Sequence, residues 1–274
     1  MPHAIRIHEP GGPEALRWDE IEVGAPGPGQ VLLRQTAIGL NFIDVYHRTG
    51  LYPLPSLPAV LGMEAAGRVE EVGEGVGGFV PGDRVAYASA PVGAYAEARL
   101  MPAERLVKVP EWISDAQAAS MMLQGMTVQY LIRRTHRVAR GEIVLFHAAA
   151  GGVGLIACQW LKHLGATVIG TVGSDEKAKI ARAHGCDHPI NYRRERFVPR
   201  VREITGGRGL PVVYDSVGKD TFEESLDCLA PLGLMVSFGN SSGPVPAVNP
   251  GILAEKGSLF LTRPTLTTYT ARRE

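Results

Sequence analysis

The sequence predicts an α/β protein in which a doubly wound parallel sheet follows a β-rich domain. Up to about Asp115 the chain is rich in glycine and proline, with short runs of β-forming residues between turns. After Asp115, short apolar strands alternate with helical patterns, as in a parallel sheet covered on both faces. The 274 residues are enough for two modest hydrophobic cores.

The strands of the β-rich part are expected where β-formers alternate or cluster. They are "QVLLRQTAIGLN" (30–41), "AAGRVEEVG" (65–73), "GDRVAYA" (82–88) and "LVKVP" (106–110). A helix with apolar residues at helical spacing follows over 114–134, with Ser114 or Asp115 as its cap.

Six strands and four helices are expected in the second part. The strands are "IVLFHA" (143–148), "TVIGTV" (167–172), "HPINY" (188–192), "PVVYDSV" (211–217), "LMVSFG" (234–239) and "SLFLTR" (258–263). The helices are expected over 152–165, 174–185, 194–206 and 220–233. In such a sheet, ligands bind beyond the carboxyl ends of the strands.

The composition argues against several classes of protein. Lys plus Arg and Asp plus Glu are balanced at 28 each, so no excess of positive charge exists to neutralise a nucleic acid. Cys158, Cys186 and Cys228 have the spacing of neither a zinc module nor a disulfide framework. The N-terminus lacks the apolar stretch of a signal peptide, and no uninterrupted apolar run suits a membrane span. We expect a cytoplasmic protein without a membrane or nucleic-acid partner.

The stretch "HAAAGGVG" (147–154) forms the first strand-to-helix turn of the expected sheet. Gly151, Gly152 and Gly154 let the backbone approach a pyrophosphate, while the helix that follows points its first N–H groups at the anion. A turn of this kind can also serve only to pack a helix against a strand. The five further strands favour phosphate binding.

The residues after the second strand of this sheet favour NADP over NAD. That strand ends at Gly173 and Ser174, with Lys177 three residues later, and a hydroxyl and a cation suit a 2′-phosphate. Asp175 and Glu176 are evidence against this, since a carboxylate there is typical of NAD sites. Acidic residues in a first helical turn also complement the helix dipole, which is an alternative explanation for both.

The chain resembles the zeta-crystallin type NADPH:quinone oxidoreductases, a zinc-free branch of the medium-chain dehydrogenase/reductase superfamily. The resemblance is carried by residues 37–67, 82–87, 141–162, 212–229 and 233–243. It implies a GroES-like catalytic domain at 1–122 and a Rossmann NADP-binding domain at 123–264. Residues 265–274 would begin a segment that returns to the catalytic domain. The rest of that segment is not in this sequence, which is therefore either a truncated form or incomplete.

Metal ligands of the zinc-dependent relatives are replaced in this chain. Asn41 lies where those relatives have a cysteine, and Met63 takes the place of the histidine in Gly-His-Glu. The resemblance therefore implies no catalytic metal. Without a Lewis acid the substrate must accept hydride readily, as quinones and activated α,β-unsaturated carbonyls do.

The resemblance places the nicotinamide and the substrate at Asn41, Phe42, Ile43, Asp44, Val45 and Tyr46. The catalytic candidates are Asn41, as a hydrogen-bonding group for the nicotinamide ribose or the substrate carbonyl, and Tyr46 and Tyr52. Tyr52 would be a cleft wall or a proton donor. Alternatively, both tyrosines only pack a proline-rich loop, and Asp44 is a structural cap.

Further cofactor contacts follow from the resemblance, position by position. They are Tyr130, Gly151, Gly152, Val153, Gly173, Ser174, Asp175, Glu176, Lys177, Tyr192, Ser216, Val217, Phe238, Gly239, Asn240, Ser241, Thr262, Arg263 and Pro264. Apart from Tyr130, all are expected near the carboxyl ends of strands, where the fold independently predicts a ligand. His147 is expected to be a core histidine rather than a catalyst.

The resemblance implies an NADPH-dependent quinone reductase that forms a homodimer through the strand at 258–263. Two alternatives remain. One is an NADPH-dependent reductase of α,β-unsaturated carbonyls. The other is a non-catalytic NADPH-binding protein, since crystallin relatives exist.

Overall fold

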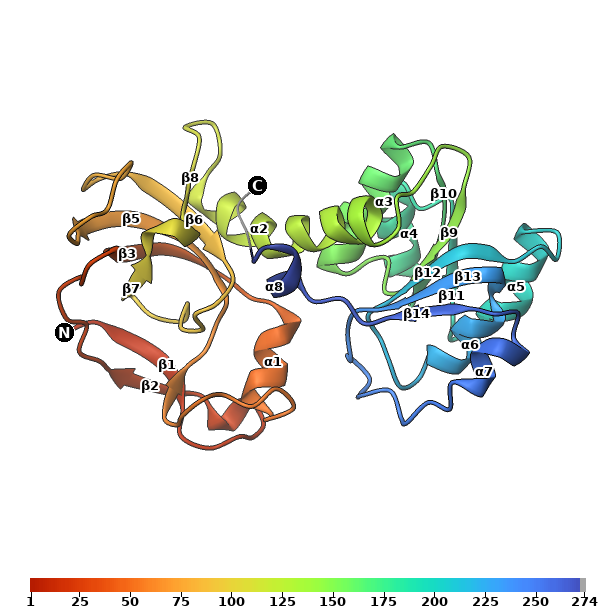
Figure 1. Cartoon of the computed structure of the whole chain (residues 1–274), viewed down its shortest axis with the longest axis horizontal. Helices are drawn as coiled ribbons and strands as arrows, with labels where there is room; N and C mark the ends of the chain where they lie inside the picture. The colour runs from red at the N-terminus through yellow and green to blue at the C-terminus, as the bar shows by residue number, and fades with distance from the viewer. Residues whose placement is uncertain (272–274) are drawn as a thin grey trace. The chain divides into compact units, whose positions relative to one another are not determined.

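A computed structural model describes residues 1–271 of the chain, which divide into two units (Figure 1). The first unit is Met1–Leu123, and the second begins at Gln124. The first is mainly antiparallel β-structure and the second is α/β, so the predicted fold class is confirmed.

Two sheets make up the first unit. A five-stranded antiparallel sheet has the order β7-β3-β5-β6-β8, and a three-stranded sheet has the order β2-β1-β4. The first consists of β3 (Gln30–Gly39), β5 (Glu64–Val72), β6 (Arg84–Ala88), β7 (Ala98–Pro102) and β8 (Val107–Lys108); the second consists of β1 (His3–Ile7), β2 (Arg17–Glu20) and β4 (Ala59–Val60). Alternating residues such as Val31 and Leu33 face the core.

Two helices complete the site-bearing part of this unit. The short helix α1 (Phe42–Arg48) begins three residues after β3. The longer α2 (Asp115–Tyr130) links the two units and continues into a π-helical turn over Leu131–Thr135. The helix predicted over 114–134 thus changes its hydrogen-bonding pattern after Tyr130.

The second unit is built on a six-stranded parallel sheet with the order β11-β10-β9-β12-β13-β14. The strands are β9 (Ile143–Phe146), β10 (Thr167–Val172), β11 (His188–Asn191), β12 (Leu210–Asp215), β13 (Leu229–Ser237) and β14 (Phe260–Thr262). Counted along the chain this order is 3-2-1-4-5-6, that of a dinucleotide-binding fold, and its switch point lies between β9 and β12.

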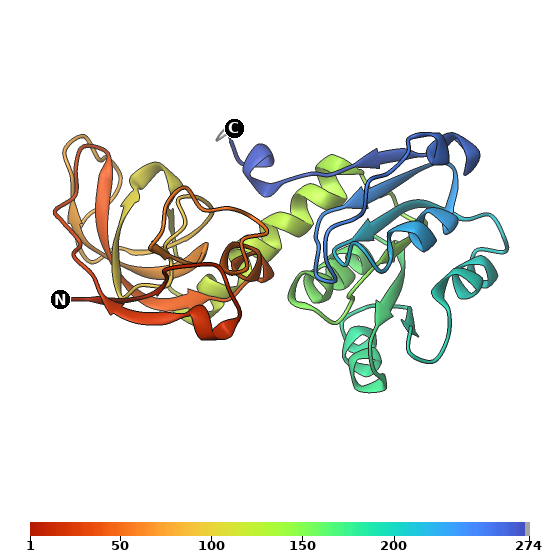
Figure 2. The ribbon, with the colours of Figure 1, turned by 90° about the horizontal axis from the view of Figure 1, so that it is seen from below.

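Helices cover both faces of this sheet (Figures 1 and 2). They are α3 (Gly152–His163), α4 (Asp175–Ala183), α5 (Phe197–Ile204), α6 (Phe222–Asp227) and α7 (Gly251–Glu255). Val144 and Phe146 of β9 belong to the core under α3, whereas Leu145 belongs to the core under α5 and α6. Both faces of the strand are buried, which explains its uninterrupted apolar sequence.

The helix predicted over 220–233 is wrong in its second half. The helix α6 ends at Asp227, and β13 begins at Leu229. The backbone N–H of Leu210 donates to the carbonyl of Cys228, and Leu210 pairs with Leu229, so this segment extends the parallel sheet. Pro231 could not have continued the helix in any case.

The helix α8 (Leu266–Tyr269) lies in the segment at 265–274. The Tyr269 ring stacks on that of Tyr130 at 4.5 Å, and its hydroxyl is 2.9 Å from that of Thr135. Residues 272–274 of this segment lie outside the described residues.

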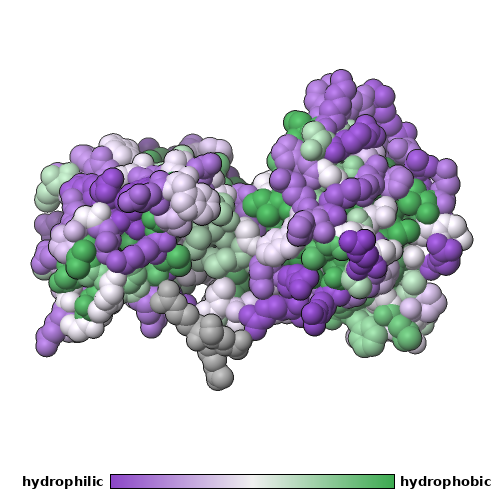
Figure 3. All heavy atoms as spheres, turned by 90° about the horizontal axis from the view of Figure 1, so that it is seen from above, coloured by the Kyte–Doolittle hydropathy of each residue, from purple (hydrophilic) through white to green (hydrophobic). Residues whose placement is uncertain are grey.

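No described helix is long and apolar enough to cross a membrane. On the face drawn in Figure 3, hydrophilic residues alternate with smaller hydrophobic groups over both units.

Candidate functional site

A buried polar network surrounds Asn41 in the first unit. Asn41 precedes α1, and its side-chain Nδ2 donates to Oε2 of Glu64 at 2.7 Å. The other carboxylate oxygen of Glu64, Oε1, accepts from the backbone N–H of Leu123 in α2 at 2.9 Å. Glu64 is completely buried and Asn41 is 6% exposed. The network therefore joins residues of β5, α2 and the start of α1.

Asp44 forms the second half of this network. Its Oδ2 accepts from the backbone N–H of Asn41 at 2.9 Å and from the Tyr95 hydroxyl at 2.7 Å. The reading of Asp44 as a cap is thus confirmed. Its other oxygen, Oδ1, is buried and has no hydrogen-bond partner among the described residues. An unsatisfied buried oxygen is unusual, and a ligand hydroxyl or a water would satisfy it.

Burial determines the protonation chemistry of these groups. It raises the pKa of Asp44, against the hydrogen bonds from Asn41 and Tyr95. It also raises the pKa of Glu64, against the hydrogen bonds from Asn41, Leu123 and Met122, and repulsion from Asp44 adds to this rise. Burial lowers the pKa of His47, whose Nδ1 has no partner among the described residues. All three shifts favour the uncharged form.

Aromatic rings gather beside this network. Tyr46 is buried, and its ring centroid lies 5.0 Å from that of Tyr52 and 5.4 Å from that of Phe42. Phe42 is about half exposed, whereas Tyr52 is partly buried. Ile43 and Val45 are also partly buried on α1. Tyr46 and Tyr52 thus pack against each other, and the exposed ring of Phe42 lies beside them.

The glycine turn of the second unit joins β9 to α3 at the switch point of the sheet. Gly151 and Gly152 are exposed, and no side chain caps the N-terminus of α3. A Cβ atom on Gly154 would lie 2.4 Å from the carbonyl oxygen of Ala148, so this position cannot carry a side chain without a backbone shift. Val153 is partly buried. The first N–H groups of α3 therefore have no capping side chain, as a phosphate site requires.

The loop after β10 has three features that bear on the ribose end of a dinucleotide. Ser174 caps α4 by accepting from the backbone N–H of Lys177 at 3.2 Å, and the Lys177 side chain is exposed. Asp175 accepts from the amide of Asn191 at 2.8 Å and forms an ion pair with Arg194. Glu176 is exposed, and two hydrogen bonds to its carboxylate lower its pKa. The larger effect comes from its own backbone N–H and the smaller from the Ser174 hydroxyl.

The other predicted contacts of the second unit also lie at the carboxyl edge of its sheet. A Cβ atom on Gly173 would lie 2.7 Å from the Tyr192 hydroxyl, so these two positions are neighbours. The N–H of Ser241 donates to the carbonyl of Ser216 at 3.1 Å. The remaining residues follow directly on β12, β13 and β14 or end the last of these: Val217, Phe238, Gly239, Asn240, Thr262, Arg263 and Pro264.

Tyr130 and His147 are both held in the core of the second unit. The Tyr130 ring is 3% exposed and stacks on Tyr269. His147 directly follows β9 rather than lying within it, and it is completely buried. Its Nδ1 pairs with the Thr171 hydroxyl and its Nε2 with that of Ser225, each at 2.9 Å. The prediction of a core histidine is confirmed.

Sequence reasoning missed Glu64 and Tyr95 as members of the network. Glu64 had a visible signal, because an acidic residue stands among apolar and small ones in "LGMEAAG" (61–67). A charge in such a stretch is seldom buried without a purpose. Tyr95 had no such signal, since it lies 51 positions after its partner Asp44.

Among residues 1–271, no three His, Cys, Asp or Glu side chains cluster in a way that could hold a metal ion. Two residues stand where zinc-dependent relatives have metal ligands. Met63 is buried, and the side chain of Asn41 donates a hydrogen bond to Glu64.

Comparisons with known proteins agree with this architecture. Residues 27–111 match the alcohol dehydrogenase GroES-like domain, and residues 152–269 match a family described as zinc-binding dehydrogenase. A quinone oxidoreductase of Pseudomonas aeruginosa is 57% identical over 98% of this chain and 83% of its own length. A 2-haloacrylate reductase of a Burkholderia species is 53% identical over all of this chain and 84% of its own length. The structure of Escherichia coli quinone oxidoreductase complexed with NADPH has 54% identity and a TM-score of 0.96, over 97% of this chain and 82% of that one.

Proposed function

The chain belongs to the quinone oxidoreductases of the medium-chain dehydrogenase/reductase superfamily, and on that premise we propose that it reduces quinones with NADPH as the hydride donor. The observation that carries this proposal is the exposed glycine turn opening α3 at the switch point of a 3-2-1-4-5-6 sheet. NADPH, when bound, supplies the hydride. The protein binds, orients and protects the reactants.

The residues of the second unit fit the dinucleotide. Backbone N–H groups at Gly152 and Val153 would bind the pyrophosphate, because α3 lacks a capping side chain and its dipole favours an anion. The adenosine end would lie along Gly173 and Tyr192. The residues following β12, β13 and β14 would complete the same edge of the sheet.

The preference for NADPH rests on the charges after β10. Lys177 is exposed and available to a 2′-phosphate, and Ser174 caps the N-terminus of its helix. Asp175, the acid that would repel a phosphate, is occupied by Asn191 and Arg194. Glu176 is exposed and is hydrogen-bonded by its own backbone N–H and by the Ser174 hydroxyl. The two carboxylates, which in the sequence were evidence against NADPH, thus have other partners within the protein.

The residues of the first unit serve the nicotinamide and the acceptor. We assign Asn41 as a hydrogen-bond donor to an oxygen of the ribose or the acceptor, because its amide is held in place by Glu64. The rings of Phe42, Tyr46 and Tyr52 form an aromatic cluster suited to a flat quinone. The Tyr52 hydroxyl is our candidate for the proton that the reduced acceptor takes up. Asn41 and Met63 offer no strong zinc ligand, so this chemistry runs without a catalytic metal.

The direct test is NADPH oxidation at 340 nm by the purified chain with a simple para-quinone. We expect rapid oxidation with NADPH and slower oxidation with NADH. NADPH binding without turnover of any acceptor would contradict the proposal and favour a non-catalytic binding protein.

Reduction of α,β-unsaturated carbonyls is the second candidate, and one finding favours it. The 2-haloacrylate reductase is almost as similar to this chain as the quinone oxidoreductases are. The same assay with an enone in place of the quinone separates the two activities. A kcat/KM that is higher for the enone would reverse our order of preference.

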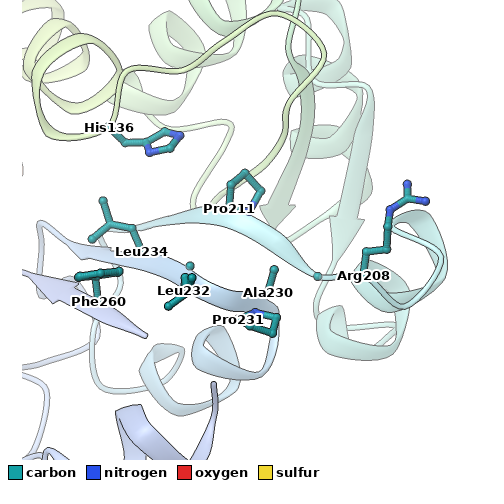
Figure 4. Close-up of a pocket in the computed structure, with 10 residues that line it drawn as sticks. His136, Arg208, Pro211, Ala230, Pro231, Leu232, Leu234 and Phe260 are labelled. Carbon is teal, nitrogen blue, oxygen red and sulfur yellow. The ribbon is translucent and has the colours of Figure 1, made fainter. Parts of the chain in front are cut away.

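We also propose that the protein is a homodimer formed through β14. This strand is the edge of the parallel sheet, and Phe260 and Leu261 are 59% and 39% exposed on it. Figure 4 shows Phe260 and Leu234 lining an apolar surface groove beside this edge. Pairing two β14 strands would satisfy both edges. Sedimentation analysis should give a dimer, and Leu261→Lys should shift it to monomers.

A cytoplasmic location is part of the proposal. Cys158, Cys186 and Cys228 are buried free thiols, as expected in a reducing compartment. Burial raises the pKa of Cys228 to about 12, which makes this thiol unreactive. Cell fractionation with an antibody to the chain would check the location.

A further inference from the structure

We infer that Glu64 is a positioning residue: its carboxylate fixes the orientation of the Asn41 amide, so that Asn41 offers a hydrogen-bond donor to its ligand. This inference rests on the proposed function for the identity of that ligand, an oxygen of the acceptor or of the nicotinamide ribose. It assigns to Glu64 a role in the reaction without contact with the reactants.

The carboxylate of Glu64 has one arrangement available to it. Its Oε1 accepts from the N–H of Leu123 at 2.9 Å, and its Oε2 accepts from Nδ2 of Asn41 at 2.7 Å. Both carboxyl oxygens are therefore acceptors in this structure, and neither donates a hydrogen bond. The NH2 end of the Asn41 amide must therefore face Glu64, because the carbonyl end would meet a like partial charge.

Glu64 is buried where two strands and a helix pack closely. Gly39, at the end of β3, pairs with Glu64 across the sheet. A Cβ atom on Gly39 would lie 2.0 Å from the carbonyl oxygen of Ala119 in α2 and 2.7 Å from Oε2 of Glu64. Only glycine therefore allows β3, β5 and α2 to meet here. The carboxylate is held from three directions.

Asp44 holds the backbone of Asn41 as Glu64 holds its side chain. Oδ2 of Asp44 accepts from the backbone N–H of Asn41 at 2.9 Å, and the Tyr95 hydroxyl anchors the same oxygen at 2.7 Å. With both the backbone and the side chain of Asn41 fixed, the amide has a defined direction. Burying two acids beside one amide lowers the stability of the fold. A role in the reaction would explain why both acids are present.

The chemical consequence concerns the second hydrogen on Nδ2. A carboxamide carries two N–H donors, and Glu64 takes one of them. The second is the donor that we assign to an oxygen of the ligand. A donor at that point stabilises the negative charge that develops on a carbonyl oxygen during reduction, whereas a reversed amide would repel it.

The first test is Glu64→Gln. The introduced glutamine can accept from Leu123 with its carbonyl and donate its NH2 group to the Asn41 carbonyl, which reverses the Asn41 amide. We expect quinone-dependent kcat/KM to fall by about 10²-fold. The thermal melting curve should remain cooperative. Glu71→Gln, on the exposed side of the same strand, is the matched control and should leave kcat/KM unchanged.

The second test needs neither turnover nor cofactor. In protein labelled with 13C and 15N, the side-chain NH2 resonances of Asn41 are identified by their loss in Asn41→Asp. We expect one of the two amide hydrogens to exchange slowly in the wild type, and both resonances to shift in Glu64→Gln. Unchanged Asn41 resonances together with wild-type kcat/KM in Glu64→Gln would overturn the inference.

A pH titration of the wild type covers the case in which Glu64→Gln fails to fold. Protonation makes one oxygen of Glu64 a donor, which should reverse the Asn41 amide and move its resonances along with the Glu64 carboxyl signal. Asp44, the other acid coupled to Glu64, is followed in the same spectra. Asn41 resonances that stay constant while Glu64 titrates would refute the positioning role. If the chain reduces no quinone, these spectra still decide the matter, so the two proposals fail separately.

Discussion

The candidate residues fall into a half in the first unit and a half in the second, and the two units hold them in opposite ways. Around Asn41, the side chains of Glu64, Asp44 and Tyr95 hold one another inside the first unit. At the start of α3 the second unit has exposed glycines and no capping side chain. The first half is specified by buried polar groups and the second by backbone conformation. Substitutions should therefore affect the two halves differently.

The largest effect is expected where the backbone half has no spare volume. Gly154→Val would place carbon atoms against the carbonyl oxygens of Ala148 and Ala149. We expect a loss of about 3 kcal/mol in the free energy of unfolding, because neither backbone can yield cheaply. Urea unfolding measures this. A stability equal to that of the wild type would mean that the turn tolerates side chains, and the contrast between the halves would disappear.

The side-chain half should respond to pH. The folded-state pKa values of Asp44 and Glu64 are raised above their ordinary values of 3.8 and 4.5, so the folded protein binds more protons than the unfolded chain above those values. The stabilisation is complete below pH 3.8 and 4.5, respectively, and is lost as the pH rises through the raised pKa values. Each pKa unit corresponds to about 1.4 kcal/mol.

Glu64→Gln removes one of these titrations. Urea unfolding as a function of pH should show a shallower decline above pH 4.5 in the variant than in the wild type. Two parallel curves would show that the carboxyl of Glu64 does not titrate in this range.

Cofactor preference should respond to the exposed charge of the second unit. Lys177→Ala is expected to weaken NADPH binding about tenfold and to leave NADH binding unchanged, since only NADPH carries the 2′-phosphate. Quenching of protein fluorescence can measure both affinities. Lys179→Ala, on the same helix and also exposed, is the control. An equal loss of affinity for NADPH and NADH would show that Lys177 does not act through the 2′-phosphate.

The smallest effect is expected at a glycine outside both halves. A Cβ atom on Gly125, within α2, would meet nothing within 4 Å. Gly125→Ala should raise the free energy of unfolding by about 0.5–1 kcal/mol, because alanine loses less conformational freedom in a helix. Thermal melting provides the measurement. A destabilised variant would show that α2 needs its glycine for a reason other than space.

The sequence by itself determined the fold class and the place of the glycine turn between β9 and α3. Apolar runs such as "IVLF" (143–146) occur only where both faces of a strand are buried, and the glycines after them leave few alternatives to a tight turn. Both are local properties, because residues that are adjacent in the sequence determine them. The sequence did not predict α1 or the strands β1, β2, β4 and β7. In the segment after Asp227, pairing with Leu210 replaced the predicted helix by a strand.

Only the tertiary structure decided how the acids around Asn41 are used. Glu64 and Tyr95 lie 23 and 51 positions from the groups they bind, and no spacing rule connects residues on a strand, a loop and a helix start. The ion pair that occupies Asp175 likewise depends on the packing of the loop after β11 against α4. Hydrogen bonds between distant side chains exist only after the sheets have closed, so the sequence could name Asn41 but not the residue that orients it.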